Sequence, residues 1–278
     1  SSMSKRQIVK KHLSFWEDHA NNEDFYRWCA AEDSQFKIDV RRFVRARNFQ
    51  SVLDCGAGSF PMRAAFLRDN PDIKYTATEI TPKYVKYGLE QGIDVHHCSL
   101  EEMPFQSETY DCCVCLDVLN HQLEYEKSIK EMLRIAKKSV IISFFKSFEE
   151  DINCYEHKHF PYKTAPGEKF TKSLLDEFKH TDLHKQYSKN IAEIFDFART
   201  RYLQHISPVP GSSIDPGEKI EKTRIGTLQH KIIKDDETVC VYHFFNFEKL
   251  QGFLSTLGLS DWVYRRSACG TVLLHIDK

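Results

Sequence analysis

The 278-residue sequence has no excess of either charge and few of the residues that interrupt regular structure. It contains 39 Lys and Arg against 40 Asp and Glu, with only 11 Gly and 9 Pro. Proteins that bind nucleic acid through their surface usually carry a strong positive excess, so we expect no nucleic-acid partner. The basic stretch 37–47 is interpreted as a solvated helix face. The composition is that of an ordinary globular protein.

The sequence also lacks an apolar run of about 18 residues and the pattern of a secretory signal peptide. We therefore expect no membrane span and a cytoplasmic location. The nine cysteines are an odd number, and four of them fall in apparent buried strands or a tight loop, namely Cys55, Cys112, Cys113 and Cys115. That pattern is typical of reduced cysteines that pack as small apolar side chains. No paired cysteine motif for zinc is present, and we expect no metal centre.

The middle of the sequence alternates short apolar runs with helical patterns, which predicts βαβ units and a mostly parallel sheet. The predicted strands are 51–54, 73–79, 93–97, 110–116 and 139–145, and the predicted helices are 62–68, 82–91 and 123–138. A further helix at 247–257 precedes two strands, 261–267 and 271–276, which read as an antiparallel hairpin. The fold class is therefore α/β, with a doubly wound, mostly parallel seven-stranded sheet that ends in an antiparallel hairpin.

Four parts of the chain are expected from these patterns. Residues 1–46 form an N-terminal helical lid, 47–146 a cofactor-binding core, 147–238 an inserted cap and 239–278 the helix and hairpin that complete the core. The inserted stretch is polar and rich in His and aromatic residues, and it contains a loop-like run at 208–213. Its aromatic and imidazole side chains make it the candidate substrate region.

A glycine loop, Asp54-Cys55-Gly56-Ala57-Gly58, follows the first predicted strand. The two glycines allow a sharp turn and a close approach to a ligand, and the next helix offers unpaired N–H groups at its start. Dinucleotide enzymes place a third glycine where this chain has Pro61. Asp54 would lie unfavourably beside a pyrophosphate but suits a cationic sulfonium or an amino group. The loop therefore argues against a nicotinamide-dependent dehydrogenase.

Glu79 ends the second predicted strand, 21 residues after Gly58. At that position a carboxylate can accept hydrogen bonds from both hydroxyls of a ribose. A surface residue at the end of a strand is the alternative, and the glycine loop at this spacing favours the ribose role.

Four segments in this order resemble the motifs of class I S-adenosylmethionine (SAM)-dependent methyltransferases: 52–58 (VLDCGAG), 75–80 (YTATEI), 98–105 (CSLEEMPF) and 110–121 (YDCCVCLDVLNH). The resemblance implies SAM as the cofactor. In the third segment Ser99 or Glu101 stands for the family's frequent acidic residue beside the adenine. The cofactor-binding residues that the resemblance implies are Asp54, Gly56, Ala57, Gly58, Glu79, Ile80, Ser99, Leu100, Glu101, Asp117 and Val118.

Methyl transfer is an in-line displacement, so the protein chiefly positions donor and acceptor away from water. A hydroxyl acceptor needs a base, whereas a neutral amine need not have one. His121, after the fourth strand, and His159, in the inserted part, are the candidate catalytic residues. Packing of His121 against the next helix is an equal alternative, and a metal site around His157 and His159 is the less favoured interpretation of that cluster.

We expect a small-molecule acceptor, with O-methylation favoured over N-methylation of a small amine. This expectation depends on the neutral charge, the large inserted region and the presence of a candidate base. The alternative to an enzyme is a non-catalytic SAM-binding subunit whose inserted region docks a partner. The sequence also allows a homodimer.

Overall fold

The computed structural model describes residues 4–20, 34–144, 152–157, 207–208, 239–245, 247–266 and 271–278. The chain divides into two compact units, one made of residues 1–28 and 148–244 and the other of residues 29–147 and 245–278. We call the second the core unit. Among the described residues, no helix is both long and apolar enough to cross a membrane.

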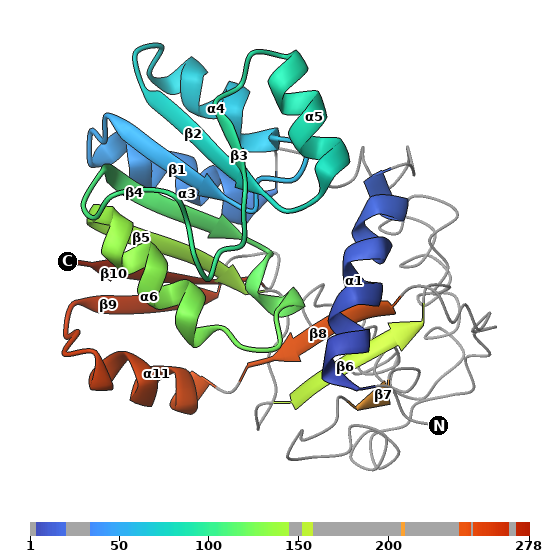
Figure 1. Cartoon of the computed structure of the whole chain (residues 1–278). Helices are drawn as coiled ribbons and strands as arrows, with labels where there is room; N and C mark the ends of the chain where they lie inside the picture. Colours follow the sequence, from blue (N-terminus) through green and yellow to red (C-terminus); the bar gives the residue numbers. More distant parts are fainter. Residues whose placement is uncertain are drawn as a thin grey trace, which may run out of the picture. The chain divides into compact units, whose positions relative to one another are not determined.

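The core unit contains a seven-stranded sheet in the order β3-β2-β1-β4-β5-β10-β9 (Figure 1). The first five strands in the sequence are parallel, and the last two add an antiparallel edge. The predicted sheet, with its closing hairpin, is confirmed. The strands are β1 (Ser51–Cys55), β2 (Lys74–Glu79), β3 (Val95–His97), β4 (Tyr110–Leu116), β5 (Ala136–Phe144), β9 (Trp262–Arg266) and β10 (Val272–Asp277).

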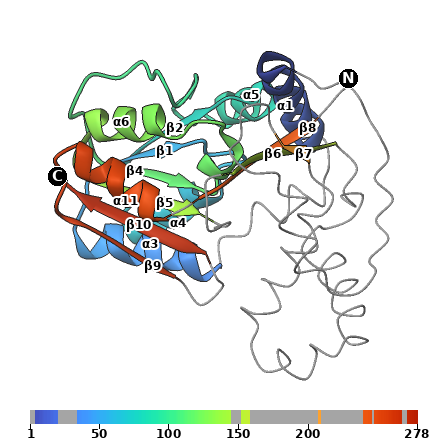
Figure 2. The same ribbon diagram turned by 90° about the horizontal axis from the view of Figure 1, so that it is seen from below.

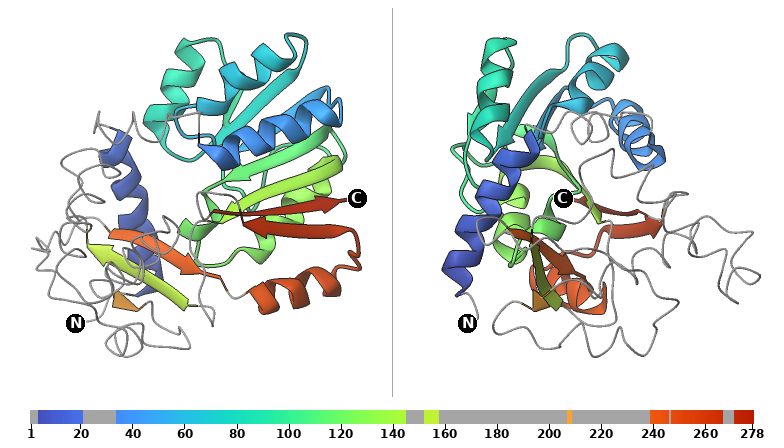
Figure 3. Two further views of the ribbon diagram at one scale, coloured as in Figure 1. Left: turned by 180° about the vertical axis from the view of Figure 1, so that it is seen from behind. Right: turned by 90° about the vertical axis from the view of Figure 1, so that its right-hand side faces the viewer.

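Helices cover both faces of this sheet. Their bounds are α3 (Gln35–Ala46), α4 (Pro61–Asp69), α5 (Pro82–Glu90), α6 (Glu126–Ile135) and α11 (Phe247–Thr256), with a short 3₁₀ turn, η1 (Leu119–His121). Figure 2 shows α6 and α3 on opposite sides of the strands, and the view from behind in Figure 3 shows α3 lying across the sheet. Because both faces are covered, the parallel strands are apolar in successive residues rather than in alternate ones.

Two apolar clusters follow from this layering. Leu53 and Cys113 point to the side covered by α6 and α11, where they join a cluster that contains Ile129 and Leu254. The neighbouring positions of the same strands point to the other side and pack against α3, α4 and α5. Cys55, Cys112, Cys113 and Cys115 are buried free thiols, as predicted. Burial raises the pKa of Cys112 and Cys115 well above the ordinary value, so these thiols stay protonated and act as packing groups.

One predicted boundary is wrong. The helical spacing at 123–138 extends too far at both ends, since α6 covers only Glu126–Ile135 and β5 begins at Ala136. Ala136 is extended and pairs with Tyr110 of β4, so strand pairing replaces the last helical turn. The polypeptide passes from helix to strand without an intervening loop.

The other unit combines α1 (Lys5–Ala20) with a three-stranded antiparallel sheet in the order β7-β6-β8. The strands are β6 (Ile152–His157), β7 (Ser207–Pro208) and β8 (Val239–Phe244). Val241 and His243 of β8 are buried, and the Val241 N–H donates to Nδ1 of His12 on α1 at 3.1 Å. The mixed polar and apolar residues at 152–157 gave no strand prediction from the sequence. The lid role of residues 1–46 stays a prediction.

Candidate active site

The carboxyl ends of β1, β2, β3 and β4 meet at one edge of the parallel sheet, which we call the carboxyl edge. Most of the residues predicted to bind the cofactor lie on strand ends or loops at this edge. Asp54 is near the end of β1, Glu79 is the last residue of β2, and Asp117 directly follows β4. The register pairs Asp54 with Ala77 of β2 and Val114 of β4, so β1 lies centrally between the two strands. Ligands of doubly wound sheets bind at this edge.

The glycine loop is fixed to the end of β2 by three hydrogen bonds. The N–H of Gly56 donates to Oγ1 of Thr78 at 3.2 Å, and the N–H of Ala57 donates to the Thr78 carbonyl at 2.9 Å. The N–H of Gly58 donates to Oε1 of Glu79 at 2.9 Å. Gly56 and Gly58 both have positive φ, at 69° and 57°, a conformation that glycine adopts without steric cost. The loop and the predicted ribose acid therefore form one connected structure.

Glu79 accepts hydrogen bonds through both of its carboxylate oxygens. Oε1 accepts from Gly58, and Oε2 accepts from the N–H of Thr81 at 2.9 Å. Burial raises the pKa of Glu79, while hydrogen bonds from the N–H groups of Thr81, Gly58 and Ile80 and from the Thr81 hydroxyl counteract part of that rise. Ile80 follows directly and is 39% exposed, which leaves an apolar surface beside the carboxylate.

The segment after β4 approaches the glycine loop closely. A Cβ built on Gly56 would lie 2.7 Å from Cγ2 of Val118, so any side chain at position 56 would collide with that residue. Asp117 has a φ of 57° and is held there by Ser143 of β5. The Asp117 N–H donates to Ser143 Oγ at 2.7 Å, and the Ser143 hydroxyl donates to Asp117 Oδ1 at 2.9 Å.

Asp54 is a buried carboxyl group at this edge with a raised pKa. Burial raises the pKa of Asp54 to about 6, although Tyr75 donates a short hydrogen bond to Oδ2 that acts in the opposite direction. Burial also raises the pKa of Asp117, against the hydrogen bond from Ser143. Three carboxyl groups with raised pKa values therefore surround the glycine loop. A cation that entered this site would stabilise their ionised forms.

Lys37 is a charged residue near these acids that the sequence reasoning missed. It lies in the first turn of α3 and is 8% exposed, which is unusual for a lysine. Its positive charge lowers the pKa of both Asp54 and Asp117. The interpretation of 37–47 as a solvated helix face is wrong for this residue. The available signal was helical spacing, because Lys37 shares the buried face of α3 with Val40 and Val44.

Two features of the loop fit a ligand with an amino-acid end. A Cβ built on Gly58 would meet no heavy atom of the described residues within 4 Å, so the backbone there borders open space. Ser59 Oγ is buried and has no hydrogen-bond partner within the described part of the chain, which is costly for a hydroxyl group. A carboxylate bound at the loop would give this hydroxyl an acceptor after rotation about χ1.

Ser99, Leu100 and Glu101 follow β3 at the same edge. Leu100 is buried in the cluster under α6, while Ser99 and Glu101 are exposed. The Glu101 N–H donates to Ser99 Oγ at 3.2 Å, so the turn is closed locally.

Of the two candidate catalytic residues, only His121 lies within the described residues. His121 is the last residue of η1, and its N–H donates to the carbonyl of Val118 at 2.8 Å. His121 therefore lies three residues after Val118, the residue that approaches Gly56 of the glycine loop. His159 lies outside the described residues. Among the residues that the structure describes, no group of three His, Cys, Asp or Glu side chains could hold a metal ion.

Comparisons with known proteins agree with these motifs. Residues 53–144 match the family profile described as a methyltransferase domain. Solved structures with similar folds include a SAM-dependent methyltransferase from Aquifex aeolicus, 12% identical over 82% of this chain and 81% of that one, with a TM-score of 0.43. A magnesium protoporphyrin IX methyltransferase from Synechocystis with bound SAH is 14% identical over 88% and 83%, with a TM-score of 0.44. An O-methyltransferase family protein from Burkholderia thailandensis is 14% identical over 88% and 56%, with a TM-score of 0.45.

The matched residues 53–144 contain the glycine loop, Glu79 and the segment after β4, within a doubly wound sheet that ends in an antiparallel hairpin. The domain is therefore a Rossmann-like cofactor-binding domain of the methyltransferase type. The family match identifies residues 53–144 as a methyltransferase domain, and the sequence motifs within it are those that imply SAM as the cofactor.

Proposed function

We propose that the chain transfers the methyl group of SAM to a small-molecule acceptor, and that the acceptor atom is a hydroxyl oxygen rather than an amine nitrogen. The observation that carries the hydroxyl preference is the position of His121 in η1, immediately after the segment that contacts the glycine loop. Deprotonating a hydroxyl requires a base in the site, and an imidazole is the side chain best suited to that role near neutral pH. The near-zero net charge supports a small acceptor over a nucleic acid.

The cofactor-binding residues follow from the geometry of the carboxyl edge. We infer that Glu79 accepts the ribose hydroxyls, because its carboxylate ends β2 at the carboxyl edge and is hydrogen-bonded to the glycine loop. Ile80 would cover the adenine, and the turn formed by Ser99, Leu100 and Glu101 would border it. The loop from Gly56 to Gly58 would follow the backbone of the methionine part. These roles agree with the predictions from the sequence.

The amino-acid end of SAM carries an ammonium group and a carboxylate. Asp54 and Asp117 would receive the ammonium group, and Lys37 would receive the carboxylate. A site with buried acids beside a buried lysine is complementary to a zwitterion, whereas it would desolvate a single charge at high cost. When bound, SAM supplies an electrophilic methyl group, and the protein residues orient it and exclude water.

The function is tested by methyl transfer from labelled SAM to a panel of matched hydroxyl and amine acceptors. We expect label in the hydroxyl compounds. His121→Ala should remove turnover while SAM affinity stays unchanged, because a base acts on the acceptor and not on the donor. His275→Ala, on β10, is the matched control and should change neither quantity.

Other outcomes identify the alternative functions. Turnover of amines that persists in His121→Ala would indicate an N-methyltransferase. SAM binding with no transfer to any acceptor would favour a non-catalytic SAM-binding subunit. If neither SAM nor its demethylated product bound, the assignment of the site would be wrong.

A further inference from the structure

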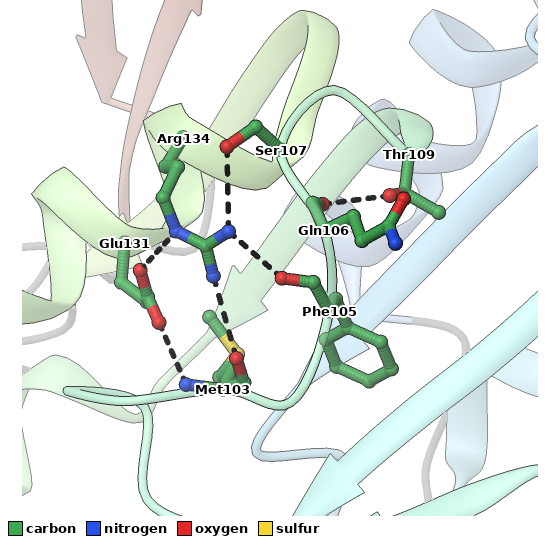
Figure 4. A network of polar contacts seen from close by, with 7 residues as sticks. All are labelled: Met103, Phe105, Gln106, Ser107, Thr109, Glu131 and Arg134. Carbon is green, nitrogen blue, oxygen red and sulfur yellow. Dashed lines mark hydrogen bonds and ion pairs between the residues drawn. The ribbon is translucent and has the colours of Figure 1, made fainter.

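The segment after β3 is attached to the end of α6 by a network of polar contacts centred on Arg134 (Figure 4). Its guanidinium group donates hydrogen bonds both to backbone carbonyls of the segment and to a side chain of α6. Nη1 donates to the Phe105 carbonyl at 2.8 Å, and Nη2 donates to the Met103 carbonyl at 3.3 Å. Nε donates to Oε1 of Glu131, one turn earlier on α6. A planar guanidinium can make these bonds together, and a lysine ammonium cannot reach the same set.

Glu131 completes the attachment. Its second oxygen, Oε2, accepts from the N–H of Met103 at 2.7 Å. The hydrogen bond from Arg134 lowers the pKa of Glu131, so the carboxylate stays ionised. The N–H of Met103 and the carbonyls of Met103 and Phe105 therefore all bond to two side chains of α6. The Phe105 N–H also donates to the Met103 carbonyl at 2.8 Å, and Pro104 between them has no N–H to donate.

The part of the segment closer to the cofactor has weaker support of its own. Between β3 and Met103, the local bonds are those of Glu101 and Glu102 to Ser99, at 3.2 and 3.4 Å. Leu100 adds an apolar anchor. Beyond Met103, the chain is fixed by Arg134 and then by the bond from the Glu108 N–H to the Arg134 carbonyl. The position of 99–101 thus depends on how firmly Met103 is held.

We propose that Arg134 and Glu131 form a positioning clamp that holds residues 99–103 in the shape that receives the adenine ring. This inference rests on the proposed cofactor site, since the clamp touches neither the cofactor nor the acceptor. Releasing the clamp lets the segment populate other conformations. The apparent dissociation constant of a ligand that depends on this shape then rises in inverse proportion to the fraction of molecules that keep it, whereas a ligand with a poorer fit to the segment depends on the shape less and changes less.

The test measures base discrimination and not affinity alone. Dissociation constants for S-adenosylhomocysteine and S-inosylhomocysteine, which differ only in the base, are compared in the wild type and in Arg134→Gln. We expect the wild type to prefer the adenine ligand. In the variant, the adenine ligand should bind about tenfold more weakly and the inosine ligand should change less, so that the preference falls. Arg134→Lys should show a similar loss of preference.

Arg41→Gln is the matched control, because Arg41 also donates through Nε and Nη2 to a carboxylate, that of Asp69. Its bridge joins α3 to α4, away from 99–103, and its loss should leave the preference within about twofold of the wild type. Hydrogen exchange at the Met103 amide should accelerate in Arg134→Gln and not in Arg41→Gln.

Several results would overturn the clamp. Equal weakening of both ligands in Arg134→Gln would indicate a structural role only, and an unchanged preference in Arg134→Gln would contradict the proposal directly. A wild type that does not distinguish the two bases would also contradict it. If Arg134→Gln does not fold, Arg134→Lys decides the question by the same ratio. Failure of the wild type to bind either ligand would contradict the proposed cofactor site instead, so the two failures are distinguishable.

Discussion

The pKa of an acidic residue is shifted in opposite directions at the two edges of the parallel sheet. At the amino edge, Asp277 accepts from Arg47 through two bonds of 3.2 and 3.4 Å and from the Ser139 hydroxyl at 2.6 Å. Burial alone would raise the pKa of Asp277, but these donors outweigh it and the pKa is lowered. At the carboxyl edge, burial prevails and the pKa of Asp54 rises to about 6.

The difference indicates which edge is organised for stability and which for binding. A lowered acid pKa means that the ionised form stabilises the folded state. A raised acid pKa means the reverse. Between about pH 4 and 6 the folded protein binds more protons at Asp54 than the unfolded chain does, so this residue makes stability fall as pH rises through that window. A buried acid that costs stability is the kind of group expected where a cationic ligand completes the site.

The largest expected effect comes from exchanging one acid at each edge for its amide. Asp54→Asn should weaken SAM binding by roughly 1–3 kcal/mol, because a charged acceptor is lost, and should raise the thermal midpoint at pH 8, because a buried charge is removed. Asp277→Asn is the matched variant and should show the opposite pattern, with a lower midpoint and unchanged affinity. Calorimetry and thermal unfolding of both variants measure the two quantities. An Asp54→Asn variant with a lower midpoint and full affinity would show that both edges serve stability.

The core of the fold could be predicted from the sequence because its signals are local. Strands such as 110–116 are short apolar runs, and the glycine loop gives its own backbone requirement at Gly56 and Gly58. The strand at 152–157 was missed, since its polar and apolar residues do not alternate regularly. The end of α6 was misplaced because the pairing of Ala136 with Tyr110 spans 26 residues and leaves no local mark.

The site was predictable where it follows strand ends, and unpredictable where distant residues support it. Asp54, Glu79 and Asp117 could be placed at one edge from the strand order alone. Their partners could not, because Tyr75 lies 21 residues from Asp54 and Ser143 lies 26 residues from Asp117. Lys37 was assigned to solvent by composition, although its spacing with Val40 and Val44 placed it on the buried face of α3.

A second prediction concerns Lys37, the buried lysine whose charge lowers the pKa of both Asp54 and Asp117. Lys37→Met should weaken SAM binding by about tenfold or more, since a charge-assisted hydrogen bond to the cofactor carboxylate would be lost. Decarboxylated SAM lacks that carboxylate, and its affinity should change by less than about twofold. Arg42→Met removes one positive charge from the exposed side of the same helix and is the control. Equal losses for both ligands in Lys37→Met would exclude a carboxylate contact and leave only a role beside the two acids.

The smallest expected effect is the pH dependence that distinguishes the two edges in the wild type. If the cofactor's cation binds beside ionised Asp54, SAM affinity should be constant above about pH 7 and fall as pH decreases through 6, by about fourfold at pH 5.5. Binding near pH 6 should also release protons, which is measured by calorimetry in buffers of different ionisation heat. Asp54→Asn should abolish both effects, and Asp277→Asn should preserve them because the lowered pKa of Asp277 keeps it ionised throughout this range. If SAM affinity in Asp54→Asn showed the same pH dependence as in the wild type, the proton released on binding would come from another group. The difference in pKa shift between the two edges would then not explain the pH dependence of binding.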